Sequence, residues 1–204
     1  MTGTLPAMSH RYGKVVVSSG HMIDAPDRET PRFPPGNEAG VAAAVERVLD
    51  GWAIGPGDVV LNGGARGADI LFAESARRRG ADVELLLALE THAFESASVC
   101  LADSIWVERF RDLLAHAGHR VVSPHEFVDT TNEFARANQA MIARARQLAP
   151  PAQLHIALIW DGNTADGPGG TADFAELARS LDAPLAIIDP LRPGDSPPRP
   201  ARRR

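Results

Sequence analysis

The stretch His155-Ile156-Ala157-Leu158-Ile159-Trp160 decides the fold, because it is a continuous apolar run rather than an alternating one. Such runs are typical of strands that are buried on both faces of a parallel sheet. The run passes directly into Asp161-Gly162-Asn163-Thr164-Ala165-Asp166-Gly167-Pro168-Gly169-Gly170-Thr171. A helix is expected after this loop, to about residue 181. The stretch therefore predicts a central strand, a glycine-rich loop and a helix in immediate succession.

The rest of the chain repeats this alternation in both directions. Further apolar runs predict strands at 15–19, 59–61, 83–89, 121–123 and 185–188. Helical spacing predicts helices at about 37–50, from the loop at 63–69 to Gly80, at about 96–117 with Ile105 and Trp106 in its core-facing stripe, and at 132–148. We therefore predict an α/β fold: a single Rossmann-like, doubly wound, mainly parallel six-stranded sheet with helices on both faces.

Composition indicates one globular domain, since 44% of the 204 residues are apolar and 23% are charged. We place this domain at 14–189, with an N-terminal extension at 1–13 and a disordered Pro/Arg-rich tail at 190–204. The single cysteine, Cys100, excludes an internal disulfide framework and favours a reducing compartment, so we expect a cytoplasmic protein. No apolar run reaches the length of a membrane helix, and no membrane association is expected.

The charge distribution argues against nucleic acid as a partner. Residues 190–204 contain five Arg and one Asp, so the remainder of the chain carries a formal charge of −9, although the whole chain carries −5. Binding to a phosphate backbone depends on clustered cations, which this acidic body lacks. The basic tail could contact RNA or an acidic partner, but its prolines and its few apolar residues favour a solvated end.

The glycine-rich loop at 167–171 has the composition of an anion-binding site. Gly169 and Gly170 permit close approach of a ligand to the backbone, and the first N–H groups of the helix at Thr171 favour an anion. The alternative is a tight turn with Thr171 as a simple N-cap. Asp161 and Asp166 could reach ribose hydroxyls or could be turn formers.

Two further loops leave strand ends at the same predicted edge of the sheet. The second strand is followed by a glycine-rich turn that brings Arg66 to the mouth of the predicted crevice and Asp69 to a helix start, where a carboxylate is more simply a cap than a base. This turn contains Gly63, Gly64, Ala65, Arg66, Gly67, Ala68 and Asp69. It lacks the Gly-Lys-Ser/Thr ending of an ATP-binding P-loop.

The third loop opens with Ser18-Ser19-Gly20-His21 and continues, rich in proline, to Gly36. A structureless segment of this length in a compact domain is usually a functional flap or a disordered insert, and the prolines favour the flap. His21 emerges at the strand end, where it either contacts a ligand or is an ordinary loop histidine. The other histidines show no ligand spacing, so neither a metal site nor a cofactor is expected.

These three loops together resemble the SLOG superfamily, a Rossmann-like group that includes the Lonely-guy phosphoribohydrolases and DprA. The similar segments are Ser18-Ser19-Gly20, Gly63 to Asp69 and Pro168-Gly169-Gly170-Thr171, and the resemblance spans about 14–189. It is greatest to the SLOG domains of bacterial conflict and signalling proteins, in which a segment such as Pro31-Arg32-Phe33-Pro34 also recurs. The resemblance implies a pocket for a nucleotide or a nucleotide-derived signal.

The same resemblance implies roles for residues on two helices. Arg136, Asn138 and Met141 are similar to the helix that enters the pocket in relatives, although they could equally be a solvent-facing helix with one core methionine. Lonely-guy enzymes carry a glutamate three residues after the loop threonine, and here that position is Phe174. Either Asp173 or Glu176 replaces this carboxylate, or the pocket binds without cleaving.

Two functions follow as hypotheses from different classes. The first is a binding or sensing domain for a nucleotide-derived ligand, which would need a separate effector protein or a homo-oligomer to pass on the signal. The second is a nucleotide N-glycosidase acting on nucleoside monophosphates, with Asp173 or Glu176 as general acid/base and Arg136 positioning the phosphate.

Overall fold

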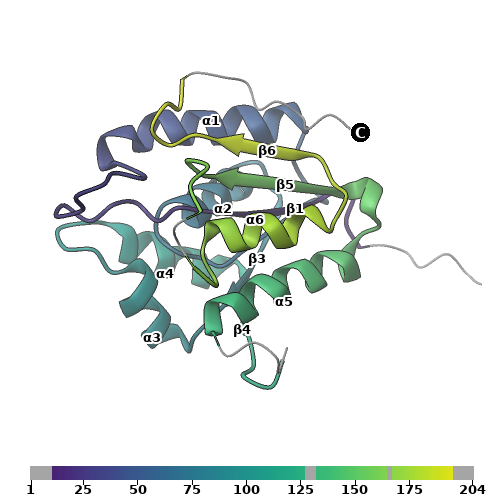
Figure 1. Cartoon of the computed structure of the whole chain (residues 1–204). Coiled ribbons are helices and arrows are strands. Elements are labelled where there is room, and N and C mark those ends of the chain that lie inside the picture. Colours follow the sequence, from purple (N-terminus) through teal and green to yellow (C-terminus); the bar gives the residue numbers. More distant parts are fainter. Residues whose placement is uncertain (1–10, 127–131, 165–166, 195–204) are drawn as a thin grey trace, which may run out of the picture.

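The described strands form one parallel sheet in a computed structural model of the chain, which describes residues 11–126, 132–164 and 167–194. The sheet has six strands in the order β4-β3-β2-β1-β5-β6 (Figure 1). Their bounds are β1 Val15–Gly20, β2 Val59–Asn62, β3 Asp82–Leu87, β4 Gly118–Val121, β5 Leu154–Ile159 and β6 Leu185–Ile188. Strands β2, β3 and β4 follow one another on one side of β1, and β5 and β6 lie on the other side. This reversal of strand order between β1 and β5 confirms the predicted Rossmann-like, doubly wound α/β fold.

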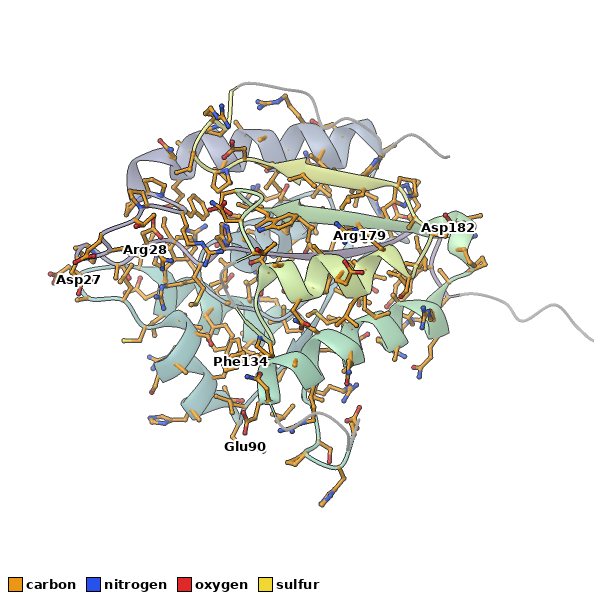
Figure 2. The ribbon with its side chains drawn as sticks, in the orientation of Figure 1. Asp27, Arg28, Glu90, Phe134, Arg179 and Asp182 are labelled. Atoms are coloured by element: carbon orange, nitrogen blue, oxygen red, sulfur yellow. The ribbon has the colours of Figure 1, made fainter. Side chains whose placement is uncertain are left out.

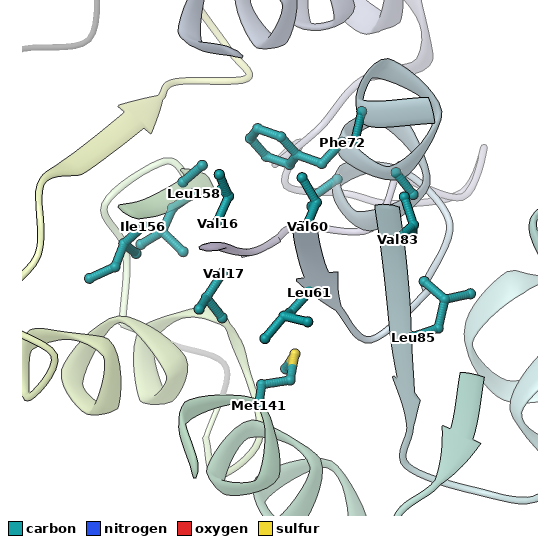
Figure 3. Packing of buried hydrophobic residues seen from close by; sticks show 14 of the residues in the cluster. Val16, Val17, Val60, Leu61, Phe72, Val83, Leu85, Met141, Ile156 and Leu158 are labelled. Carbon is teal, nitrogen blue, oxygen red and sulfur yellow. The ribbon is translucent and has the colours of Figure 1, made fainter. Parts of the chain in front are cut away.

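The central strands are apolar on both faces because helices cover both faces. Val17 of β1 is paired with Leu61 of β2 on one side and with Ile156 of β5 on the other. Figure 3 shows these alternating positions: Val16 and Val60 point to one side of the sheet, and Val17 and Leu61 to the other. Every one of these side chains is buried, so the core occupies both layers.

The helices are arranged in two layers around the sheet. Helices α1 and α2 pack on one face, helices α5 and α6 pack on the other, and α4 packs beside α2 (Figure 1). Their bounds are α1 Glu38–Gly51, α2 Ala68–Arg78, α3 Thr91–Phe94, α4 Trp106–His116, α5 Glu133–Leu148 and α6 Thr171–Arg179. Short helical segments are η1 Pro35–Asn37, the π-helical η2 Glu95–Val99, and η3 Pro151–Gln153.

The single helix predicted at 96–117 is wrong. Helix α3 and η2 end at Val99, the backbone becomes extended at Cys100, and Asp103 has a φ of 53°. A second helix, α4, begins only at Trp106, so that Ile105 is 62% exposed instead of lying in the core. The fourth strand, predicted at 121–123, is also displaced, because β4 covers Gly118–Val121.

Residues on both sides of the predicted domain, 14–189, pack against it. Tyr12 is buried, and its hydroxyl donates a hydrogen bond to Asp82 at 3.1 Å. After residue 189 the chain lies against α1, where Arg47 donates to the Pro193 carbonyl at 3.1 Å. The rest of the predicted extension and tail lies outside the described residues. None of the described helices combines the length and the hydropathy that crossing a bilayer requires.

Candidate functional site

A hollow of about 460 Å³ lies at the edge where the carboxyl ends of the strands meet. This volume is within the usual range of small-molecule sites. All three loops predicted to carry the site contribute to its wall, namely Ser19, Gly20 and His21 after β1, Gly63 and Ala65 after β2, and Pro168, Gly169, Gly170 and Thr171 after β5. The topology therefore brings together segments that are more than a hundred residues apart in the sequence.

The loop before α6 presents its backbone to the hollow. Gly169 has a φ of 85°, and a Cβ atom there would lie 2.7 Å from the Cβ of Phe134, so only glycine fits. The Gly169 N–H donates to the Asp173 carboxylate at 3.1 Å, which ties the loop to the first turn of its own helix. Thr171 begins α6, so the positive end of the helix dipole lies at the wall of the hollow.

His21 connects the three loops. Its N–H donates to the carbonyl of Ile159 at 2.9 Å, and its own carbonyl accepts the N–H of Ala68 at 3.2 Å. Its imidazole is hydrogen-bonded to the Thr171 hydroxyl at 3.2 Å through Nδ1 and to Asp161 Oδ1 at 2.9 Å through Nε2. The side chains of His21 and Asp161 are each only 3% exposed, so this network is internal.

The pKa values of the pair show that Asp161 is the charged member. Burial lowers the pKa of His21, against the opposing effect of its hydrogen bond to Asp161, so that the imidazole is neutral at pH 7. Burial alone would raise the pKa of Asp161. Hydrogen bonds from the Asn163 backbone, from His21 and from the Asn163 side chain outweigh burial and lower that pKa to about 2.

The proline-rich segment after β1 is an ordered flap. Asp24 closes it on itself, since its carboxylate accepts the N–H groups of Arg32 at 2.8 Å and Phe33 at 2.9 Å. Arg28 and Arg32 both line the hollow, and Figure 2 labels Arg28 on this flap. Arg32 Nη2 lies 3.1 Å from His21 Nε2, and Arg32 Nε lies 3.8 Å from Asp161, so the flap is joined to the network described above. Arg28, Arg32 and the N-terminus of α6 therefore line the same hollow.

The turn after β2 differs from expectation at Arg66. The Arg66 guanidinium donates to the carbonyls of Ile23 at 3.4 Å and Cys100 at 3.3 Å, and it does not line the hollow. Gly67 is needed for packing, because a Cβ atom there would lie 2.5 Å from the Ile23 nitrogen. Gly64 has a φ of 83° and faces the core side chain of Phe110. Of the predicted residues in this turn, Gly63 reaches the hollow and these three do not.

Asp69, expected to be a simple helix cap, lies in the wall of the hollow. It is 6% exposed, and its Oδ2 accepts the N–H of Ala65 at 3.1 Å. Its Oδ1 has no hydrogen-bond partner among the described residues. Burial raises the pKa of Asp69 to about 7, although N–H groups of the glycine-rich turn oppose this shift.

Helix α5 supplies one side of the hollow, as the resemblance implies. Asn138 and Met141 line it, and the Asn138 amide donates to Asp173 at 3.2 Å. Arg136 is 8% exposed, does not line the hollow, and lies 3.8 Å from Glu133 on its own helix. The proposed phosphate-positioning role of Arg136 therefore has no support in this geometry.

Neither candidate for the missing carboxylate lines the hollow. Asp173 accepts hydrogen bonds from Gly169 and Asn138, and so it fixes the loop. Glu176 is exposed and pairs with Arg179. Phe174, which occupies the position of the enzymatic glutamate, is fully buried.

Two other predicted contacts also differ. Ser18 is fully buried and accepts a hydrogen bond from Asn62 at 3.2 Å. Asp161 does not line the hollow, and its carboxylate is hydrogen-bonded to His21, which does. It is therefore a structural anion. Asp166 lies outside the described residues.

Apolar side chains that were not predicted as site residues also line the hollow. They are Leu86 of β3, Ala88 after it, Phe94 and Ala97, and Phe134 at the start of α5 lines the hollow from another element (Figure 2). Leu86 and Ala88 fall in the strand predicted at 83–89, and Ala97 in the helix predicted at 96–117, whose break at Cys100 carries no glycine or proline. Within the described parts of the chain, no group of three or more His, Cys, Asp or Glu residues is placed to hold a metal ion.

The segments Ser18–Gly20, Gly63–Asp69 and Pro168–Thr171 thus lie at one edge of a sheet in Rossmann order. The chain has a Rossmann-like, doubly wound α/β fold. No model of a known protein family matches the chain, and no curated protein matches its sequence. The solved structures that are similar to it include the following two. DprA from Streptococcus pneumoniae is 15% identical with a TM-score of 0.49 over 89% of this chain.

The match to DprA covers 53% of that protein, so this chain spans about half of its length. The structural genomics target TM1055 is 18% identical with a TM-score of 0.44, over 84% of this chain and 72% of that one. At these identities the similarity concerns the fold alone.

Proposed function

We propose that the chain binds a nucleotide or a nucleotide-derived ligand in the hollow at the strand ends. The observation that carries this proposal is the convergence of the α6 N-terminus with Arg28 and Arg32 in one wall. A helix N-terminus and guanidinium groups both favour phosphate, and together they favour it more than either does alone.

The opposite wall supports a ligand with a ring. Phe94, Ala97, Leu86 and Ala88 offer apolar contact, which a free phosphate ion would not use. Ligand sites typically combine such walls with a few placed polar groups. A phosphorylated sugar that carries a base has both the anionic and the flat apolar part that this hollow accommodates.

Binding without cleavage is favoured over the N-glycosidase alternative. That alternative requires Asp173 or Glu176 to act on the ligand, and neither residue lines the hollow. Incubation with nucleoside monophosphates, followed by chromatography for free base, tests it directly. Release of base above the level of a heat-treated control would restore the enzymatic assignment.

A thermal-shift screen with AMP, ADP-ribose, NAD and cyclic nucleotides tests the binding proposal. We expect at least one compound to raise the melting temperature, and Arg28→Ala to weaken its affinity about tenfold through loss of a charge-assisted hydrogen bond. Arg179→Ala is the matched control, since Arg179 lies at the far end of α6 from Thr171. No shift with any compound at millimolar concentration, in a folded protein, would contradict the proposal.

A further inference from the structure

Asp69 is a buried carboxyl group that the proposed phosphate wall does not use. It follows Gly67 and Ala68 at the start of α2, and its Oδ2 is held by the Ala65 N–H under the glycine-rich turn. A Cβ atom on Gly63 would lie 3.1 Å from this oxygen, so the turn encloses the carboxyl group closely. Oδ1, in contrast, lacks a partner within the described chain, and Asp69 lines the hollow.

Leaving a buried polar atom unpaired costs free energy, which requires an explanation. No residue in the described ranges forms a hydrogen bond with Oδ1, and hydrogen bonding with a bound molecule would remove the cost. Asp69 is also the only carboxylate in the wall of the hollow among the residues that the structure describes. Its position therefore indicates contact with a ligand rather than a further structural bond.

The strand order locates Asp69 relative to the two ends of the hollow. The sheet runs β3-β2-β1-β5, so the turn after β2 lies between the apolar segments after β3 and the flap after β1. A hydrogen bond from the Arg66 N–H to the Ser98 carbonyl, at 3.0 Å, attaches this turn to η2, which follows Phe94. The phosphate-favouring loop lies after β5, beyond β1. Asp69 thus lies toward the apolar end.

We propose that Asp69 recognises the ring of the ligand, with Oδ1 forming a hydrogen bond to an acceptor atom of a nucleobase, such as an unprotonated ring nitrogen or a carbonyl oxygen. The inference rests on the proposed function and deepens it, because it assigns the base to the wall near η2. A neutral carboxyl group has one O–H to donate, and an ionised one has none. Nucleobase binding should therefore weaken when Asp69 ionises.

Few other charges complicate this dependence. The titratable and charged groups that line the hollow with Asp69 are His21, Arg28 and Arg32, all from the segment after β1. His21 is already neutral at pH 7, since burial lowers its pKa. The strands β1, β2 and β3 and the helices α1 and α4 that pack against α2 contribute no charge to the shift at Asp69, which arises from burial and backbone N–H groups.

Calorimetric titration with AMP, GMP, CMP, UMP and ribose 5-phosphate between pH 6.0 and 8.5 tests this assignment. Ribose 5-phosphate carries the same phosphate without a ring, so its profile removes the titration of the phosphate itself. In the wild-type protein, at least one nucleotide should bind more tightly than ribose 5-phosphate at pH 6. That advantage should fall above pH 7, approaching tenfold per pH unit.

Asp69→Asn supplies the diagnostic variant. An amide retains an N–H at the position of Oδ1 and does not titrate, so the nucleotide should bind about as at pH 6 across the whole range. Asp112→Asn, on the exposed part of α4, is the matched control and should retain the wild-type profile. A merely structural Asp69 would not change the pH profile of nucleotide binding relative to ribose 5-phosphate.

The outcomes separate the two proposals. Nucleotides that bind no tighter than ribose 5-phosphate, or that keep the same pH profile in Asp69→Asn, would overturn the inference and leave the phosphate site standing. Failure of all five compounds to bind would overturn the proposed function together with it. If the variant does not fold, the wild-type protein alone decides. A ratio of nucleotide affinity to ribose 5-phosphate affinity that stays constant from pH 6.0 to 8.5 contradicts the assignment.

Discussion

Two buried carboxylates at the same edge of the sheet, Asp161 and Asp69, differ in protonation: Asp161 is ionised at neutral pH, whereas Asp69 titrates there. Burial raises the pKa of each. Asp161 follows β5 and accepts hydrogen bonds from Asn163 and His21, which lower its pKa to about 2. Asp69 follows β2 and has only backbone N–H groups on one side, so burial prevails and its pKa is about 7. Burial thus outweighs the hydrogen bonds at Asp69, whereas the hydrogen bonds outweigh burial at Asp161, and this balance separates a group that titrates in the physiological range from a fixed anion.

This difference corresponds to two functions of the two regions. The region after β5 is held rigidly, since Asp161 orders His21, and His21 in turn contacts Thr171 and the flap. The region after β2 leaves one buried oxygen of Asp69, a residue that lines the hollow, without a hydrogen-bond partner among the described residues. The first region would pre-organise the phosphate end of the site, and the second would select the ligand. The following experiments test whether the two carboxylates differ in this way.

Removing Asp161 should give the largest effect on stability. Asp161→Ala deprives His21 and the Asn163 backbone of their acceptor and removes the ion pair with Arg32, and we expect the free energy of unfolding to fall by about 2 to 3 kcal/mol. Urea denaturation at pH 7 measures this. Asp112→Ala is the control, because Asp112 is exposed and pairs with Arg77 at the surface. Equal effects of the two substitutions would contradict the structural role of Asp161.

The pH dependence of stability should distinguish Asp69 from Asp161. The folded pKa of Asp69, about 7, lies above its model value of 3.8, so the folded state holds more protons between these values. Stability from this group is complete below pH 4 and decreases as the pH rises to 7, by at most about 1.4 kcal/mol per pH unit. Asp69→Asn should flatten this decrease, as measured by urea denaturation at pH 5, 6, 7 and 8. Identical slopes in variant and wild type would show that Asp69 does not titrate as described.

Asp161 should act in the opposite direction. Its folded pKa, about 2, lies below its model value of 3.8, so its contribution to stability is present above pH 4 and is lost as the pH falls toward 2. In Asp161→Asn this acid-dependent part should be absent. An unchanged acid limb between pH 4 and 2 in the variant would contradict the assignment of Asp161 as the fixed anion.

The smallest effect is expected at Thr171. Thr171→Val keeps the branched shape and removes the hydroxyl that bonds His21, at an expected cost of about 1 kcal/mol or less in urea denaturation. Thr171→Ser keeps the hydroxyl and serves as the matched control. A larger loss in Thr171→Ser than in Thr171→Val would show that the methyl contact, and not the hydrogen bond, stabilises this junction.

Much of the fold could be predicted from the sequence because strong patterns coincide with it. The apolar run before Asp161 and the glycine-rich loop after it predicted β5 and the start of α6 closely. The segment between Thr91 and His116 could not be predicted in this way. Its break lies at Cys100 and Asp103, and no glycine or proline marks it. Tertiary packing of η2 against the turn after β2 determines where that helix ends.

The candidate site shows a similar division. Loops that follow parallel strands were certain to meet at one edge, so Gly63, Gly169 and Thr171 could be grouped from the sequence alone. The direction in which each side chain points could not be predicted from the sequence. Arg66 turns toward the carbonyls of Ile23 and Cys100, and Asp69 turns into the wall of the hollow, although the two residues are separated by one turn of chain.

An NMR titration of the ¹⁵N-labelled chain with AMP and, separately, with ADP-ribose tests the central claim most directly. The claim is that the loops after β1, β2 and β5 form one site for an anionic nucleotide-derived ligand. It predicts that the amide signals of Gly169, Gly170 and Thr171 shift together with those of Gly63 and Ala65, along one saturation curve. Shifts confined to one loop, shifts elsewhere on the molecule, or no shifts at millimolar ligand would contradict it.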